Sequence, residues 1–197
     1  MSRSAWLSVV FCAVVVSSVC ASAAEGIIDL GPEEIIQAKG ADITVPGYSV
    51  PSLEDWNNDR LRDLIVGEGG GGFTGKIRVY LNVGTEADPC FADFFYVQAD
   101  GQDLSVPPQG CQGSFPRVVQ WDGDGRQDLL VGLADGTAKI FLNIADNNAP
   151  AFDAGTLVMT GSNGSLTLDV GDRAAPSLDQ WNDDGMLDLV VGGRDGL

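Results

Sequence analysis

The sequence predicts an all-β fold made of β-propeller-like four-stranded blades. Three observations support this fold class. A segment with one Trp and several Asp residues occurs three times in the 197-residue chain. Short apolar runs of strand-forming residues surround each copy. The 26 Gly and 9 Pro residues provide many turns, and 44% hydrophobic with 20% charged residues is typical of a globular protein.

The first element, residues 1–24, has the layout of a secretory signal peptide. Arg3 gives a positive start, an apolar run covers residues 5–16, and small residues lead to a cleavage site near Ala23 or Ala24. The run is shorter than the ~20 residues of a membrane-spanning helix. We therefore expect residues 25–197 to be secreted, periplasmic or on the cell surface, with no membrane insertion after cleavage.

Three copies of one motif define the repeat, at residues 51–67, 116–132 and 176–192. Each copy begins with Pro, carries a central Trp and ends in Asp-Leu-Xaa-Val-Gly. A repeat of about 60 residues containing several short strands is typical of a propeller blade. The alternative is a β-sandwich with accidental internal similarity, which three aligned copies disfavour.

Each repeat is expected to contain four short strands. The first leads into the Trp, the second is the Asp-Leu-Xaa-Val-Gly run, the third ends in Leu-Asn, and the fourth follows Pro-Xaa-Phe. In the first two repeats the third and fourth strands involve residues 76–82, 139–143, 89–91 and 150–152. The dipeptides Asp135-Gly136 and Asn163-Gly164 are typical of hairpin turns. Alternating apolar residues precede each motif copy, namely Ile43 and Val45, Leu104 and Val106, and Leu166, Leu168 and Val170.

Oxygen-bearing side chains recur at every second position around the Trp of each motif. Carboxylates this close repel one another unless a cation lies among them, and a compact set of oxygen ligands suits Ca²⁺. An EF-hand is excluded because loop position twelve is Val66, Val131 or Val191 instead of Glu. The candidate ligands are Asp55, Asn57, Asp59, Leu61 (carbonyl) and Asp63; Gln120, Asp122, Asp124, Arg126 (carbonyl) and Asp128; and Gln180, Asn182, Asp184, Met186 (carbonyl) and Asp188.

The pattern Asp-x-Asn/Asp-x-Asp-Gly-x-x-Asp-Leu-x-Val-Gly resembles the FG-GAP/VCBS repeat family, which includes the propeller blades of integrin α-chains and of many secreted bacterial proteins. The resemblance covers nearly all of the chain after the predicted signal peptide. It implies that each loop binds Ca²⁺ and joins the first two strands of a blade. The sequence departs from the pattern at Gln120 and Gln180, which replace the first Asp, and at Arg60, which replaces Gly at a cost of about 1 kcal/mol.

The three loops are expected to differ in affinity. Their side-chain carboxylates number three, three and two, so the third loop should bind Ca²⁺ most weakly, and each site should fall in the ~10⁻⁴–10⁻³ M range of extracellular modules. The alternative, strongest for the third loop, is that Asp and Asn side chains hold the turns by hydrogen bonds without metal. The motif residues Trp56, Trp121 and Trp181 are expected to pack between blades instead of stacking on a ligand.

Two Cys residues, Cys90 and Cys111, lie outside the predicted signal peptide. Both are peculiar to one repeat, and Cys111 lies in an insertion at residues 107–113 that the other repeats lack. Because Cys pairs of exported proteins are usually oxidised, we expect a disulfide between them. It would close a loop of about 20 residues and add roughly 3 kcal/mol of stability.

The composition excludes several function classes. The chain has no His, so it cannot carry a Ser-His-Asp triad, a Cys-His pair or a His-ligated zinc site. Its net charge of −17 disfavours nucleic acids and anionic membranes as partners. We expect no enzymatic activity, and a calcium-binding scaffold that binds an extracellular protein or glycan, as in cell adhesion. The alternatives are the non-catalytic propeller module of a secreted polysaccharide-active enzyme and a structural spacer of the envelope.

Propellers close with at least four blades, whereas this sequence holds about three repeats. After Asp135-Gly136 the second repeat continues into another strand, but the sequence stops at the corresponding Asp195-Gly196-Leu197. We therefore expect an incomplete propeller, truncated at the C-terminus, that further blades or self-association would complete.

Overall fold

The computed structural model describes residues 33–107, 113–182 and 184–196. The predicted signal peptide lies outside the described residues. Ile35–Leu197 form one compact unit, and the following description concerns that unit. Its described residues form strands and turns only, and none of them belongs to a helix that could cross a membrane. The predicted all-β class is confirmed.

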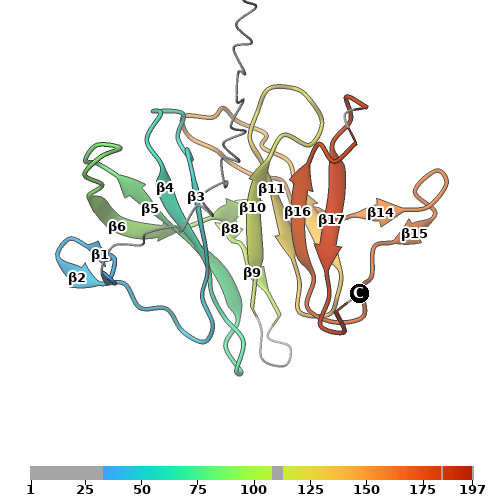
Figure 1. The fold of residues 1–197 in the computed structure, drawn as a ribbon, viewed down its shortest axis with the longest axis horizontal. Coiled ribbons are helices and arrows are strands. Elements are labelled where there is room, and N and C mark those ends of the chain that lie inside the picture. Colours follow the sequence, from blue (N-terminus) through green and yellow to red (C-terminus); the bar gives the residue numbers. More distant parts are fainter. Residues whose placement is uncertain (1–32, 108–112, 183, 197) are drawn as a thin grey trace, which may run out of the picture. The chain divides into compact units, whose positions relative to one another are not determined.

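The first repeat forms an antiparallel sheet whose four main strands follow one another in sequence order. These strands are β3 (Val50–Glu54), β4 (Asp63–Gly67), β5 (Gly75–Asn82) and β6 (Phe91–Tyr96) (Figure 1). They lie where the repeat pattern predicts them. Three two-residue strands extend the sheet, with β1 (Gln37–Ala38) on β6, β2 (Ala41–Asp42) on β1, and β9 (Ser105–Val106) on the start of β5.

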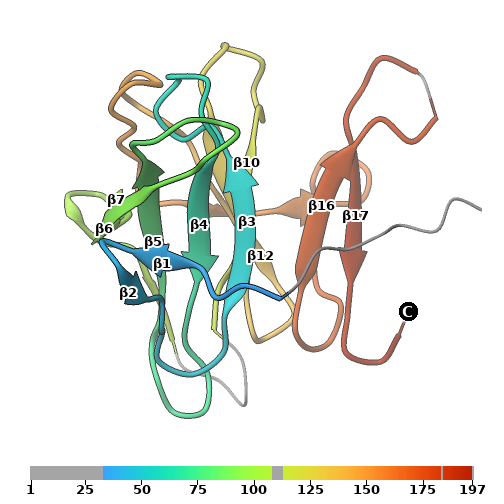
Figure 2. The same cartoon turned by 60° about the vertical axis from the view of Figure 1, so that its left-hand side comes forward.

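The second repeat forms a separate antiparallel sheet with the same strand order. Its strands are β10 (Phe115–Val119), β11 (Asp128–Gly132), β12 (Ala138–Phe141) and β13 (Thr156–Leu157). The third repeat contributes β16 (Ala175–Asp179) and β17 (Asp188–Gly192). The first strands of the three repeats are neighbours, because β10 contacts both β3 and β16 (Figures 1 and 2).

Two small hairpins follow the fourth strands of the first two repeats. The first is β7 (Gln98–Ala99) with β8 (Gln102–Asp103), and the second is β14 (Met159–Thr160) with β15 (Leu166–Thr167). At the turn of the second hairpin, Asn163 and Gly164 have φ angles of +64° and +63°. The Gly164 amide donates a hydrogen bond to the Gly161 carbonyl at 3.2 Å within the loop that joins β14 to β15. The hairpin predicted at this dipeptide is therefore confirmed.

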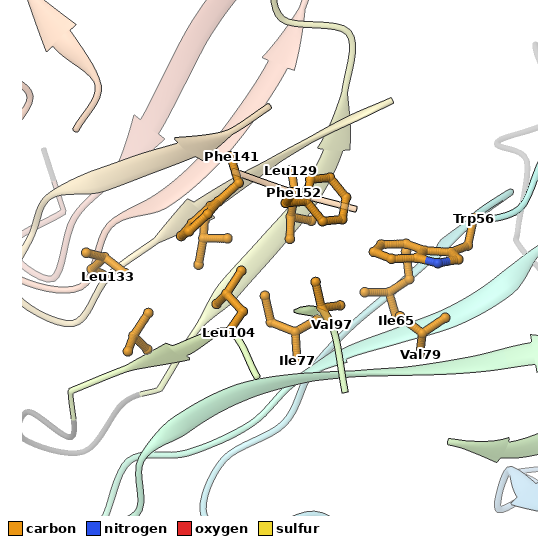
Figure 3. Packing of buried hydrophobic residues seen from close by; sticks show 12 residues of the cluster. Trp56, Ile65, Ile77, Val79, Val97, Leu104, Leu129, Leu133, Phe141 and Phe152 are labelled. Carbon is orange, nitrogen blue, oxygen red and sulfur yellow. The ribbon is translucent and has the colours of Figure 1, made fainter. Parts of the chain in front are cut away.

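A hydrophobic core fills the space between the first and second sheets (Figure 3). Ile65 of β4 and Leu129 of β11 are fully buried there. Trp56 lies at the end of the cluster, with its ring centroid 5.8 Å from that of Phe152. Full burial of each such side chain contributes about 1.5–3 kcal/mol, so the two repeats stabilise each other through this cluster.

The glycine that ends the second strand is required by the next repeat. A Cβ atom on Gly67 would lie 2.2 Å from the Ser114 carbonyl oxygen and 2.6 Å from Cδ of Pro116. A Cβ atom on Gly132 would lie 2.1 Å from the Ala174 carbonyl oxygen and 2.5 Å from Cδ of Pro176. Any larger residue would separate the repeats, so these glycines serve close backbone approach.

The prediction for the three motif tryptophans is right for Trp56 and wrong for Trp121 and Trp181. Trp56 is 4% exposed, whereas Trp121 is 36% and Trp181 is 82% exposed. The difference lies in what covers each ring. Phe152 and its neighbours in the second repeat cover Trp56. Among the described residues, no equivalent cover shields Trp181 from solvent.

Candidate functional site

The candidate ligands lie in three loops that occupy the same place in each repeat. These loops connect β3 to β4, β10 to β11, and β16 to β17. Each runs from the residue before the motif Trp to the Asp that begins the second strand. The predicted position of the loops, between the first two strands of a sheet, is therefore confirmed.

The last Asp of the motif holds strand ends together. Asp63 is fully buried, and its Oδ2 accepts a hydrogen bond from the Trp56 amide (2.9 Å) while its Oδ1 accepts one from the Asn82 amide (2.7 Å). In the second repeat Asp128 accepts hydrogen bonds from the Trp121 and Asn143 amides, both at 2.9 Å. One carboxylate thus joins the end of the first strand, the start of the second and the end of the third.

The third repeat has half of this arrangement. Asp188 accepts a hydrogen bond from the Trp181 amide at 2.9 Å. Asp188 is partly exposed, whereas Asp128 is 1% exposed. The described part of the third repeat contains no strand at the place of β5 or β12. The same motif residue therefore has a weaker structural role in the third repeat.

Burial also changes the acidity of Asp63, the last Asp of the motif in the first repeat. Removal of Asp63 from water raises the pKa of its carboxyl, and the hydrogen bonds from the Asn82 and Trp56 amides oppose that rise. The negative charges of Asp59 and Asp55 raise this pKa further. A cation in the loop would offset the repulsion among these three carboxylates.

In the first loop, side-chain oxygens converge on the loop backbone. The Asp59 amide donates to Oδ1 of Asp55 (3.1 Å) and to Oδ1 of Asn57 (3.2 Å), and the Leu61 amide donates to Oδ1 of Asp59 (2.8 Å). Because two of these oxygens contact one nitrogen, they face the same loop interior. Such hydrogen bonds are those of the metal-free alternative, but the same oxygens are the hard donors that Ca²⁺ prefers.

In the second loop a cationic side chain already neutralises one candidate ligand. The Nε of Arg126 donates to Oδ2 of Asp124 at 2.6 Å, and the guanidinium forms an ion pair with the same oxygen. This hydrogen bond lowers the pKa of Asp124. A metal ion would have to compete with Arg126 for that oxygen. The carboxylate count ranks the first two loops as equal in expected affinity for Ca²⁺. It therefore overstates the affinity expected of the second loop.

The third loop repeats the local pattern with fewer charges. The Asp184 amide donates to Oδ1 of Asn182 (3.1 Å), and the Met186 amide donates to Oδ1 of Asp184 (2.8 Å). Both side chains are exposed, and Asp183 between them lies outside the described residues. The first candidate positions of the second and third loops, Gln120 and Gln180, are also exposed.

Two residues outside the set of candidate ligands support the second loop. Asn147 accepts a hydrogen bond from the Gln127 amide (2.7 Å) and donates from Nδ2 to the Gly125 carbonyl (3.0 Å). The side-chain amide of Gln127 donates to the Asp55 carbonyl of the first loop at 2.9 Å. The other repeats carry Arg62 and Leu187 at the position of Gln127, so comparison of the repeats offers no signal for this link.

The strained position predicted in the first loop is confirmed. Arg60 has a φ of +71°, where the second and third loops have Gly125 and Gly185 at +86° and +82°. Replacing Arg60 with Gly is expected to raise the free energy of unfolding by about 1 kcal/mol, because Gly adopts this conformation without steric cost. Urea denaturation measures the change. Asn58→Gly, at φ +59°, is the control. Its free energy of unfolding should rise less, since Asn tolerates the left-handed region. A loss of stability in Arg60→Gly would contradict the strain.

The predicted disulfide stays a prediction. Cys90 is exposed and forms no disulfide with any described residue, and Cys111 lies outside the described residues.

Acidic groups do not gather into a preformed metal centre in the described ranges. Among the residues of 33–107, 113–182 and 184–196, no group of three Asp, Glu or Cys side chains could by itself hold a metal ion. Calcium in these loops would therefore depend on Asn side chains and main-chain carbonyls as well as carboxylates.

Comparison with known proteins adds no relative. No family model matches the chain, no curated protein is similar to it, and no solved structure matches it.

Proposed function

We propose that this chain is a secreted or cell-surface calcium-binding propeller segment, and that it acts as a non-catalytic scaffold for binding an extracellular protein or glycan. The observation that carries the proposal is the threefold recurrence of one loop. In each repeat, motif oxygens accept hydrogen bonds from the backbone of the same loop, which joins the same two strands. Recurrence of hard oxygen donors at one structural position supports a common ligand for the three loops.

The sheets support the propeller part of the proposal. In each of the first two repeats four consecutive strands pair antiparallel in sequence order, and the first strands of successive repeats are neighbours, as in propeller blades. The FG-GAP/VCBS resemblance of the motif agrees with this arrangement and with an exported protein.

In the first loop the residues that would hold Ca²⁺ are Asp55, Asn57, Asp59 and Asp63, with the Leu61 carbonyl. Bound Ca²⁺ would supply positive charge that relieves carboxylate repulsion and fixes the loop. The chain's own residues place the donors, because β3 and β4 set the two ends of the loop and Asp63 holds those ends together. Stiff loops on rigid sheets are suited to presenting a binding surface.

A melt in millimolar Ca²⁺ and in EDTA tests the calcium proposal. At a free Ca²⁺ concentration ten times the dissociation constant, each occupied site should add about 1.4 kcal/mol to the free energy of unfolding. The midpoint should therefore rise in Ca²⁺ and should rise less in the double variant Asp55→Asn, Asp59→Asn. Equal melting in Ca²⁺ and EDTA would leave the loops as hydrogen-bonded turns without a metal.

The rival class is enzymatic, namely the propeller of a secreted hydrolase or lyase that acts on polysaccharides. Incubation with a panel of polysaccharides separates the two, because a scaffold retains a glycan unchanged whereas an enzyme produces new reducing ends. Turnover by the purified chain would overturn the non-catalytic proposal.

A further inference from the structure

A pocket with a volume of about 520 Å³ lies between the first and second repeats. One wall is the hairpin of β7 and β8 together with β9, and the other wall is β12 and β13 with the loops that precede them. The Asp100 amide donates a hydrogen bond to the Phe152 carbonyl at 2.9 Å, which joins the two walls. A pocket of this size is typical of a site for a small organic group.

The pocket is separate from the candidate calcium loops. The second loop precedes β11, whereas Leu133, which lines the pocket, directly follows β11. The pocket and this loop therefore lie at opposite ends of one strand. No candidate calcium ligand is among the described residues that line the pocket. A ligand bound here would leave the loops untouched.

The floor of the pocket is apolar. Leu104, Leu133 and Phe141 line it, and they lie at the end of the hydrophobic core away from Trp56 (Figure 3). These three side chains are 3–7% exposed, so the packed core continues directly into the floor. Leu157 also lines the pocket and is 42% exposed, which makes it an accessible apolar side chain. The pocket thus offers carbon surface against which a short hydrocarbon chain can pack.

Charged groups of predominantly one sign line the same pocket. Asp100, Asp103 and Asp135 contribute carboxylates, and Lys139 is the one cationic residue among the described lining residues. Asp103 is already paired with Lys76, whose Nζ lies 2.9 Å from its Oδ2. Asp100 and Asp135 form no ion pair with any described residue. Two carboxylates of the pocket are therefore available to a cation.

We propose that this pocket binds an alkyl-ammonium group, that is, an ammonium carried on a short hydrocarbon chain. The hydrocarbon packs on the apolar floor, and the ammonium lies in the field of Asp100 and Asp135. The net charge of −17 also favours the approach of a cation. A neutral or anionic group of the same size would leave both carboxylates without a countercharge. Free alkylamines and the lysine side chains of extracellular proteins share the required chemistry.

Three compounds with one hydrocarbon chain and different charges test the proposal. At pH 7 hexylamine is a cation, hexanol is neutral and hexanoate is an anion. Each is titrated into the chain from residue 25 onward, and binding is followed by NMR chemical shifts. Hexylamine should bind most tightly, hexanol more weakly and hexanoate not at all, and the affinity for hexylamine should fall as salt is added. Equal affinities for hexylamine and hexanol, or no binding of hexylamine, would overturn the proposal.

Charge variants test which groups face the ammonium. The double variant Asp100→Asn, Asp135→Asn should weaken hexylamine binding by about two- to fivefold for each carboxylate removed. Asn tolerates the φ of +51° at Asp100, so the fold is kept. Lys139→Met should tighten binding by a similar factor, because it removes a like charge. The control Glu86→Gln, Asp88→Asn removes the same charge from the exposed loop between β5 and β6. Unchanged binding in the pocket variant, or an equal loss in the control, would contradict the proposed site.

A steric variant locates the site without changing charge. Ala154 lines the pocket and is exposed, so Ala154→Trp should fold and fill the pocket. Hexylamine should no longer bind to it, whereas Ala87→Trp, at an exposed residue outside the pocket, should bind as the wild type does. Binding that survives Ala154→Trp would place the site elsewhere and overturn the proposal. Nα-acetyl-lysine methylamide distinguishes the two sources of the group. Tighter binding than that of hexylamine indicates a lysine side chain of a protein, and weaker binding indicates a free amine.

Discussion

Replacing Asp128 with Ala is expected to lower the free energy of unfolding by about 4 kcal/mol, even when no metal is present. The carboxylate is 1% exposed and accepts hydrogen bonds from the Trp121 and Asn143 amides. Its removal leaves two N–H groups without an acceptor, one of them on the buried Asn143. Each unsatisfied group costs about 1–3 kcal/mol, and the two losses should add because they affect two separate strands.

Urea denaturation in EDTA measures this loss free of any contribution from calcium. The matched control is Asp188→Ala, in which the same motif residue is partly exposed and accepts a hydrogen bond from the Trp181 amide. Its expected cost is about 1 kcal/mol. Asp128→Asn should fall between these values, because the amide keeps one acceptor oxygen. Equal losses at Asp128 and Asp188 would show that the contact with the third strand contributes nothing.

The strands and loops could be predicted because the chain repeats them. Asp63, Asp128 and Asp188 recur in one register before one apolar run, and that pattern places the second strand and the loop before it. The structural role of these carboxylates could not be predicted, since the spacing that suggests a metal ligand also suits a hydrogen-bonded strand clamp. Only the position of the Asn82 and Asn143 amides shows that Asp63 and Asp128 hold strand ends together.

Contacts between repeats could not be predicted from the sequence for a different reason. Gln127 links the second loop to the first, yet its counterparts are Arg62 and Leu187, so the contact belongs to one interface. Comparing repeats shows what they share, while the environment of a residue depends on the neighbour that packs against it. The tryptophans illustrate this limit, because one motif position has three different degrees of burial.

Replacing Trp56 with Ala is expected to cost about 3–5 kcal/mol of folding free energy, the usual range for a buried Trp. The ring is 4% exposed, packs on Phe152 and lies 6.4 Å from the Phe95 ring centroid. Trp181→Ala is the control, because this ring is 82% exposed and a surface substitution changes stability by about 0.5 kcal/mol or less. Trp121→Ala, at 36% exposure, should lie between them. Circular dichroism is the suitable probe, since the substitutions remove fluorescence.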